Sequence, residues 1–243
     1  MLHPSRALAR LAGILYLVVG IAGGFAQLGV RSSLLVTGDA AATADRIRES
    51  SDIVRLGFVA DVVNVTAFIL LAFVLYRLLS PVSQHAAAAF VVLNAIAAAV
   101  MGVSLIAHAG ALLLATDANY AAALGTVQAD TLSHLFLGLH AHGYLVAEVF
   151  FGLWLIPLGY AVYRSGYFPR VIGPALAFGG FCYVATFTIT VLSPGFQPAD
   201  WAPLVALPAG IAEVGFLLWL LVRGANLPVE GSAVGRRAEP VPA

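Results

Sequence analysis

Three carboxyl side chains stand inside long apolar segments of the sequence. Asp61, Glu148 and Glu213 each lie in a run that is long and apolar enough to cross a membrane. Placing an acid at the centre of a bilayer costs about 2.5–3.5 kcal/mol, so each of these residues needs a hydrogen-bonding partner or a wet cavity. An acid in this setting is therefore a candidate for ligand binding or proton transfer.

Further polar residues fall at similar depths in these segments. Asn64 follows Asp61 by three residues, so the two side chains share roughly one helix face. His140, Tyr144 and Glu148 follow one another at four-residue intervals and form one polar stripe on a helix. The candidates for ligand binding are Asp61, Asn64, His108, His140, Tyr144, Glu148 and Glu213.

Histidine and carboxylate side chains could instead hold a metal ion. The candidate ligands are His108, His140, Asp61 and Glu213, with Glu148 as general base toward a metal-bound water. No HExxH or other paired-ligand motif supports this alternative. On a helix, His142 points about 200° away from His140, so the two cannot clamp one ion. We therefore expect no metal and no cofactor.

The same residues fit three interpretations. In the first, the acids are protonated or hydrogen-bonded across helices and fix which helix packs beside which, as in a structural subunit of a membrane complex. The second is an outward-facing pocket that binds or moves a small polar ligand, a proton or a lipid headgroup. The third is a metal-dependent hydrolase of lipid amides or esters. The second is our expectation, and we favour a protein that is not an enzyme.

The composition places the chain in a membrane. Of 243 residues, 61% are hydrophobic and 10% are charged, with a mean hydropathy of +0.95. Soluble domains average about 45–50% apolar and about 25% charged residues. Because a basic excess and paired cysteines are missing, we expect no nucleic-acid binding and no disulfide scaffold. The lipid bilayer is the expected partner, and the composition says nothing about oligomeric state.

Six segments meet the length of about 20 apolar residues that a membrane-spanning helix needs. The sequence therefore predicts an all-helical bundle of six transmembrane helices within residues 1–225. The predicted spans cover residues 11–30, 56–79, 86–107, 135–163, 171–192 and 204–222. We expect the pocket to form between the second, third, fourth and sixth spans.

The positions of the arginines predict the orientation. Arginines cluster before the first span, after the second, between the fourth and fifth, and after the sixth, and all these places lie on one side of the membrane. That side is expected to be the cytoplasm, because cytoplasmic loops are rich in Lys and Arg. Both termini are therefore predicted to be cytoplasmic, in a protein of the bacterial inner membrane.

The segment after the first span is an exception, because it is charged but lies on the outer side. Residues 32–52 are expected to form a short interfacial helix and loop, with Asp39 as the N-cap. Arginines here are matched by nearby acids at i,i+3 spacing, such as Asp45 with Arg48 and Asp52 with Arg55. At the other end of the chain, residues 226–243 have no periodic apolar face and are predicted to be a disordered cytoplasmic tail.

Several stretches look like parts of a known family. They include RLAGILYL at 10–17, GDAAATA at 38–44, LYRLLSPV at 75–82, RSGYFPR at 164–170 and AEVGFLLWLL at 212–221. Together they resemble the bacterial family of membrane proteins called domain of unknown function 4386, from about Arg6 to Gly224. The resemblance implies a multi-helix membrane protein. It brings no reaction, ligand or active site, so no catalytic residue can be carried over.

Overall fold

A computed structural model describes residues 5–193 and 203–226, and this part of the chain contains helices and no strand. Six of its helices are long and apolar enough to cross a membrane, which confirms the predicted all-helical, six-span class. The elements are α1 (Arg6–Gly24), η1 (Phe25–Val30, a π-helix), η2 (Arg31–Ser33, a 3-10 helix), α2 (Ala40–Glu49), α3 (Ser51–Leu79), α4 (Gln84–Thr116), α5 (Ala118–Leu124), α6 (Thr126–Ser165), α7 (Ile172–Leu192) and α8 (Pro203–Val222).

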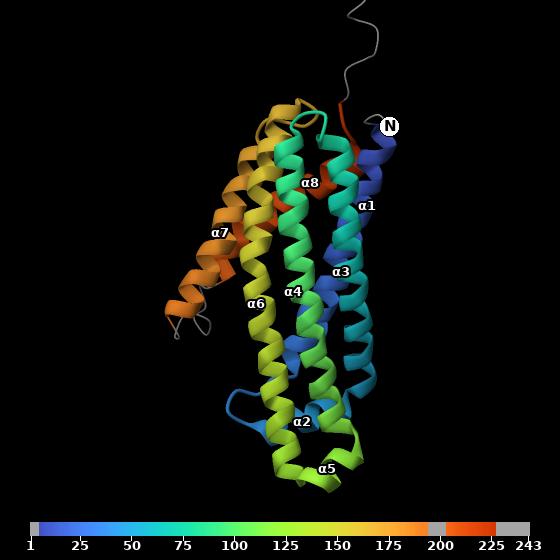
Figure 1. Ribbon diagram of the computed structural model, residues 1–243, viewed down its shortest axis with the longest axis vertical. Helices are drawn as coiled ribbons and strands as arrows, with labels where there is room; N and C mark the ends of the chain where they lie inside the picture. Colours follow the sequence, from blue (N-terminus) through green and yellow to red (C-terminus); the bar gives the residue numbers. More distant parts are fainter. Residues whose placement is uncertain (1–4, 194–202, 227–243) are drawn as a thin grey trace, which may run out of the picture.

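α3, α4 and α6 run roughly along one axis, α8 crosses the bundle obliquely, and α4 and α6 lie side by side over most of their length (Figure 1). α1 begins and α8 ends at one end of the bundle, whereas α2 and α5 lie at the other end (Figure 1). At the first end, the backbone N–H of Asn226 donates to the carbonyl oxygen of Tyr167, at 3.0 Å. Of the predicted tail, residues 226–243, all but Asn226 lie outside the described residues.

Three helices continue beyond the predicted spans at the end that carries α2 and α5. α3 starts at Ser51, α4 runs to Thr116, and α6 starts at Thr126, so that α6 has 40 residues and a length of about 60 Å. The sequence prediction did not include these extensions because hydropathy detects only the part of a helix that lipid surrounds. The helical extensions are stabilised by a second, smaller core that includes Val30, Ile47 and Leu137.

The charged segment after α1 folds as a short helix with local ion pairs. The side chain of Asp39 caps α2 by accepting a hydrogen bond from the N–H of Ala42, at 2.9 Å. The ion pairs expected at i,i+3 spacing are present: Arg48 binds Asp45 at 2.7 Å and Arg55 binds Asp52 at 3.2 Å. Local spacing was sufficient to predict these contacts because both partners lie on one helix.

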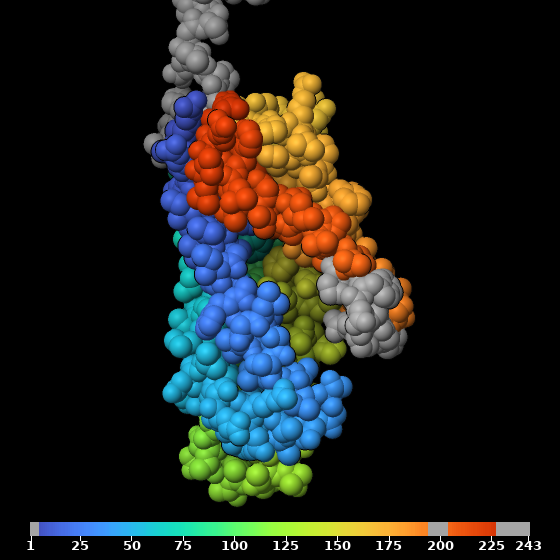
Figure 2. Space-filling model, turned by 180° about the vertical axis from the view of Figure 1, so that it is seen from behind, coloured from blue at the N-terminus to red at the C-terminus, as the bar shows by residue number. Residues whose placement is uncertain are grey.

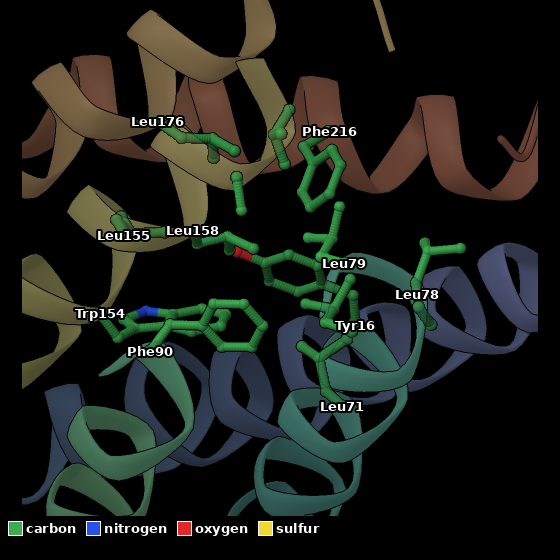
Figure 3. Close-up of a cluster of buried hydrophobic side chains, with 14 of the residues drawn as sticks. Tyr16, Leu71, Leu78, Leu79, Phe90, Trp154, Leu155, Leu158, Leu176 and Phe216 are labelled. Atoms are coloured by element: carbon green, nitrogen blue, oxygen red, sulfur yellow. The ribbon is translucent and has the colours of Figure 1, made fainter. Parts of the chain in front are cut away.

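The main hydrophobic core lies toward the end where the chain begins, between α1, α3, α4, α6, α7 and α8. Figure 3 shows Tyr16 of α1 facing Trp154 of α6, with Phe216 of α8 close by. The ring centroid of Tyr16 lies 6.3 Å from that of Trp154 and 6.4 Å from that of Phe216. The tilted contact of Tyr16 with Trp154 and its edge-to-face contact with Phe216 hold α1 and α8 against α6.

Glycines bring α6 and α7 into backbone contact. A Cβ atom added at Gly173 would lie 2.6 Å from the carbonyl oxygen of Gly159 and 2.7 Å from the Cβ atom of Tyr163. Neither neighbour is the flexible end of a side chain, so this crossing needs glycine. Small residues serve the same purpose at many helix crossings in membranes, where packing replaces the hydrophobic drive between helices.

The substitution Gly173→Ala is expected to destabilise the bundle by about 1–3 kcal/mol, the usual cost of forcing extra volume into a packed interface. Thermal unfolding of the purified protein in mild detergent would measure the effect. Gly102→Ala is the matched control, because a Cβ atom there meets nothing within 4 Å. Equal melting temperatures for the two variants would contradict the close crossing of α6 and α7.

Candidate functional site

An ion pair between Arg31 and Asp61 is buried inside the bundle. Only 9% of Arg31 and 2% of Asp61 is exposed. The guanidinium binds the carboxylate through both terminal nitrogens: Nη2 donates to Oδ1 at 2.9 Å, and Nη1 donates to Oδ2. The third nitrogen of the guanidinium, Nε, donates to Oε1 of Gln27 at 3.1 Å. The charge of Asp61 is therefore neutralised by a bidentate partner, the strongest kind of charge-assisted hydrogen bonding.

Two buried histidines lie against this pair. His108 of α4 and His140 of α6 are 1% and 2% exposed, and one donor atom of each lies within 4.8 Å of the other and of a carboxylate oxygen of Asp61. The Nδ1 atom of His140 donates to the carbonyl oxygen of Ser104 at 2.9 Å. Its Nε2 atom is buried without a hydrogen-bond partner among the described residues, and so is Nε2 of His108. We call Arg31, Asp61, His108 and His140 the charged cluster.

The local backbone explains how Arg31 reaches Asp61. Residues 25–30 are π-helical, and Arg31 follows directly as the first residue of η2. A π-helical turn holds extra residues, so it rotates the side chains that follow relative to an α-helix. Close contact with α3 is possible because Gly57 has no side chain: a Cβ atom there would lie 3.2 Å from Val30.

A separate cavity of about 280 Å³ lies nearer the main core. Its polar wall consists of Tyr16, Gln27, Asn64, Tyr144, Tyr183 and Glu213. The carboxylate of Glu213 accepts hydrogen bonds from the hydroxyls of Tyr16, at 2.5 Å, and Tyr183, at 2.9 Å. Glu213 therefore joins three helices, α1, α7 and α8, at the edge of an open space.

The cavity opens on one face of the molecule. Figure 2 shows a hollow between α1 and the obliquely crossing α8, with parts of α4 and α6 behind it. Gly20 and Gly24 of α1 line the cavity, and a Cβ atom added to either would meet nothing within 4 Å. The opening therefore lies between two membrane-spanning helices and not at an end of the bundle.

The structure divides the seven predicted site residues into two groups and leaves one apart. Asp61, His108 and His140 belong to the charged cluster, and Asn64, Tyr144 and Glu213 line the cavity. Glu148 is half-buried on α6 and belongs to neither. The sequence had suggested that the three acids share one cavity, but only Glu213 lines it, whereas Asp61 lies in the charged cluster and Glu148 in neither group. Glu213 is likewise not a neighbour of the other proposed metal ligands.

The predicted site residues did not include Gln27, Arg31, Tyr16 and Tyr183. Arg31 was counted with the outer charges that nearby acids neutralise, but its partner is Asp61, thirty residues away. Tyr16 and Tyr183 were not singled out, although each is a hydroxyl-bearing residue within an apolar span and binds Glu213. Because of them, the cavity includes α1 and α7, which the predicted pocket left out.

His142 confirms the argument from helical rotation. Its side chain is exposed and its Nδ1 atom donates to the carbonyl oxygen of Gly138 on the same helix, at 2.8 Å. His140, two residues earlier, is buried against Asp61 and His108. The two histidines therefore face opposite sides of α6.

Six helices that are long and apolar enough to cross a membrane define a multi-pass membrane protein. Over residues 11–224, the chain matches the family described as domain of unknown function DUF4386. The chain belongs to this family, which confirms the resemblance seen in its sequence.

An uncharacterized protein of Archaeoglobus fulgidus is 30% identical to the chain over 79 residues, which is 32% of this chain. The match spans less than half, 44%, of the length of that relative. No solved structure matches the chain.

Removing one partner of the buried ion pair should lower the stability of the protein more than removing both. Arg31→Leu leaves the carboxylate of Asp61 without a counter-charge and is expected to cost about 3–5 kcal/mol of stability, whereas the double variant Arg31→Leu, Asp61→Leu should recover most of that loss. Thermal unfolding in detergent would compare the variants. Arg55→Leu is the control and should cost less than about 1 kcal/mol, because the pair with Asp52 is exposed. A double variant that is less stable than Arg31→Leu would contradict the pairing.

Proposed function

We propose that the cavity at Glu213 binds a small lipophilic cation, such as an amine or a quaternary ammonium group with an apolar substituent. The observation that carries this proposal is the state of the Glu213 carboxylate. Its hydrogen-bond donors are two neutral phenols, and none of the ion pairs between described residues includes it. A carboxylate that is hydrogen-bonded but lacks a counter-charge, at the wall of an open cavity, attracts a cation from outside.

The aromatic lining supports a cation over a neutral polar ligand. Phe68, Phe151 and Trp154 line the cavity together with the tyrosines, and the rings of Phe68 and Trp154 pack edge to face at 5.1 Å. Aromatic faces attract ammonium groups through their negative electrostatic potential, by about 0.5–2 kcal/mol each. The apolar surface of the same rings would accommodate the hydrocarbon part of the ligand.

The size of the cavity limits the ligand. A volume of about 280 Å³ is close to the lower end of small-molecule pockets, which begin at about 300 Å³. An amine headgroup with a short substituent fits this space. A longer apolar chain would extend through the opening between α1 and α8 into the lipid, which supports entry of the ligand from the bilayer (Figure 2).

Binding of benzyltrimethylammonium to the purified protein in neutral detergent should be detectable by isothermal titration calorimetry, whereas benzenesulfonate, an aromatic anion of similar size, should not bind. Glu213→Gln should weaken binding of the cation by at least about tenfold, corresponding to about 1.4 kcal/mol. Gly24→Leu should abolish binding by filling the cavity, because Gly24 lines it and a Cβ atom there meets nothing within 4 Å.

Two matched variants serve as controls for that titration. Glu148→Gln removes a carboxylate outside the cavity, and Gly102→Leu adds the same side chain in an open place on α4. Both should keep the wild-type affinity. Equal binding of the cation and the anion, or unchanged binding in Glu213→Gln, would refute the proposal.

We also propose that the protein lies in a bacterial inner membrane with both termini in the cytoplasm. Arg77, Arg164 and Arg223 lie near the end of the bundle where α1 begins, and the rule that positive charges face the cytoplasm assigns this end to the inside. Because the number of spans is even, the start of α1 and the end of α8 lie on the same side of the membrane.

Maleimide labelling of single cysteines in intact cells tests the orientation. In a Cys182→Ala background, a membrane-impermeant maleimide should label Asn119→Cys, which is exposed in α5, and should leave Gln84→Cys, at the start of α4, unlabelled until the cells are opened. The reverse pattern would mean that the termini lie outside.

A further inference from the structure

We infer that Asp61, His108 and His140 form a binding site for a divalent transition-metal ion, with Zn²⁺ as the chemically best match. This site is separate from the proposed cation cavity and goes beyond the function proposed for it. The inference rests on the position of three donor atoms and on two ring nitrogens that have no hydrogen-bond partner within residues 5–193 and 203–226.

The three residues supply a donor set that zinc uses. Two imidazoles and one carboxylate converge from α4, α6 and α3, and the donor atoms lie within 4.8 Å of one another. Donor atoms that surround a tetrahedral zinc ion at about 2.0–2.2 Å stand roughly 3.4 Å apart, so binding requires the side chains to close by at most about 1.4 Å. All three residues are at least 98% buried, so an ion there would be shielded from water.

The state of His140 supports the role of a ligand. Its Nδ1 atom donates to the carbonyl oxygen of Ser104, so the proton is on Nδ1 and the lone pair is on Nε2. This is the arrangement in which a metal-binding histidine is usually held: one nitrogen is fixed by a carbonyl and the other is free for the ion. The Nε2 atoms of His140 and His108 both lack a partner among the described residues, and such buried atoms normally have one.

Arg31 limits what the site can hold but leaves part of the Asp61 carboxylate free to bind an ion. An ionised carboxylate has about four lone-pair sites, and the bidentate guanidinium uses two of them, so Asp61 can bind Arg31 and a metal at the same time. With Arg31 beside it, a divalent ion leaves excess positive charge in an apolar interior. Since three protein ligands leave the fourth position of zinc open, the charge favours an anionic fourth ligand such as hydroxide.

Metal content provides the test. The protein would be purified in detergent through a tag without histidine, stripped with chelator, incubated with Zn²⁺ and desalted, and the zinc measured by plasma mass spectrometry. We expect about one zinc per chain in the wild type and loss of most of it in Asp61→Asn, His108→Gln and His140→Gln. Zinc below about a tenth of an equivalent in the wild type would overturn the inference.

Two variants separate this site from adventitious binding and from the cavity. His142→Gln removes an exposed histidine from the same helix as His140, and Glu213→Gln changes only the cavity, so both should keep their zinc. Loss of zinc in His142→Gln together with its retention in His140→Gln would overturn the assignment. Because zinc and benzyltrimethylammonium bind different residues, either result can fail while the other stands.

Co²⁺ substitution covers the case in which the ligand variants do not fold. Wild-type protein loaded with Co²⁺ should show intense visible absorption bands, which four-coordinate cobalt with nitrogen and oxygen ligands gives and octahedral aqueous cobalt does not. Weak bands like those of the aqueous ion would contradict a site built from these three side chains.

Discussion

The bidentate ion pair between Arg31 and Asp61 is the interaction on which the arrangement of the buried polar residues depends. A guanidinium or a carboxylate alone in an apolar interior costs several kcal/mol, so neither residue can occupy its place without the other. The ion pair fixes the π-helical end of the first span against α3. The same guanidinium holds Gln27, which belongs to the wall of the cavity, so the ion pair also determines one side of that space.

Asp61 and Glu213 have different hydrogen-bonding partners inside the bundle. Asp61 is neutralised within the protein and is surrounded by buried imidazoles. Glu213 accepts hydrogen bonds from two hydroxyls and has no cationic partner among the described residues. The first arrangement suits a rigid structural or metal-binding centre, whereas the second suits a centre that receives charge from a ligand. The two arrangements share Gln27 and the neighbouring turn of α3, where Asp61 and Asn64 lie three residues apart.

The helices could be predicted from the sequence, but the contacts between them could not. Long apolar runs must be helical in a membrane, because backbone groups there have no water to bind. The pair of Asp45 with Arg48 was predictable because both lie on one helix. The contact of Arg31 with Asp61 was not, because helical periodicity tells which residues share a face but not which helix that face meets. The π-helical turn adds a rotation for which the sequence has no clear signal.

The two unobstructed glycines of α1 have a consequence for how such a protein can diverge. Gly20 and Gly24 border the cavity, contact nothing that would resist a larger side chain, and take no part in the ion pair or the main core. Mutations at these two positions can therefore reshape the cavity at little cost to folding. Under the binding role proposed for the cavity, relatives with the same six helices and the same buried ion pair are free to select different molecules, and common ancestry within the family need not mean a common ligand.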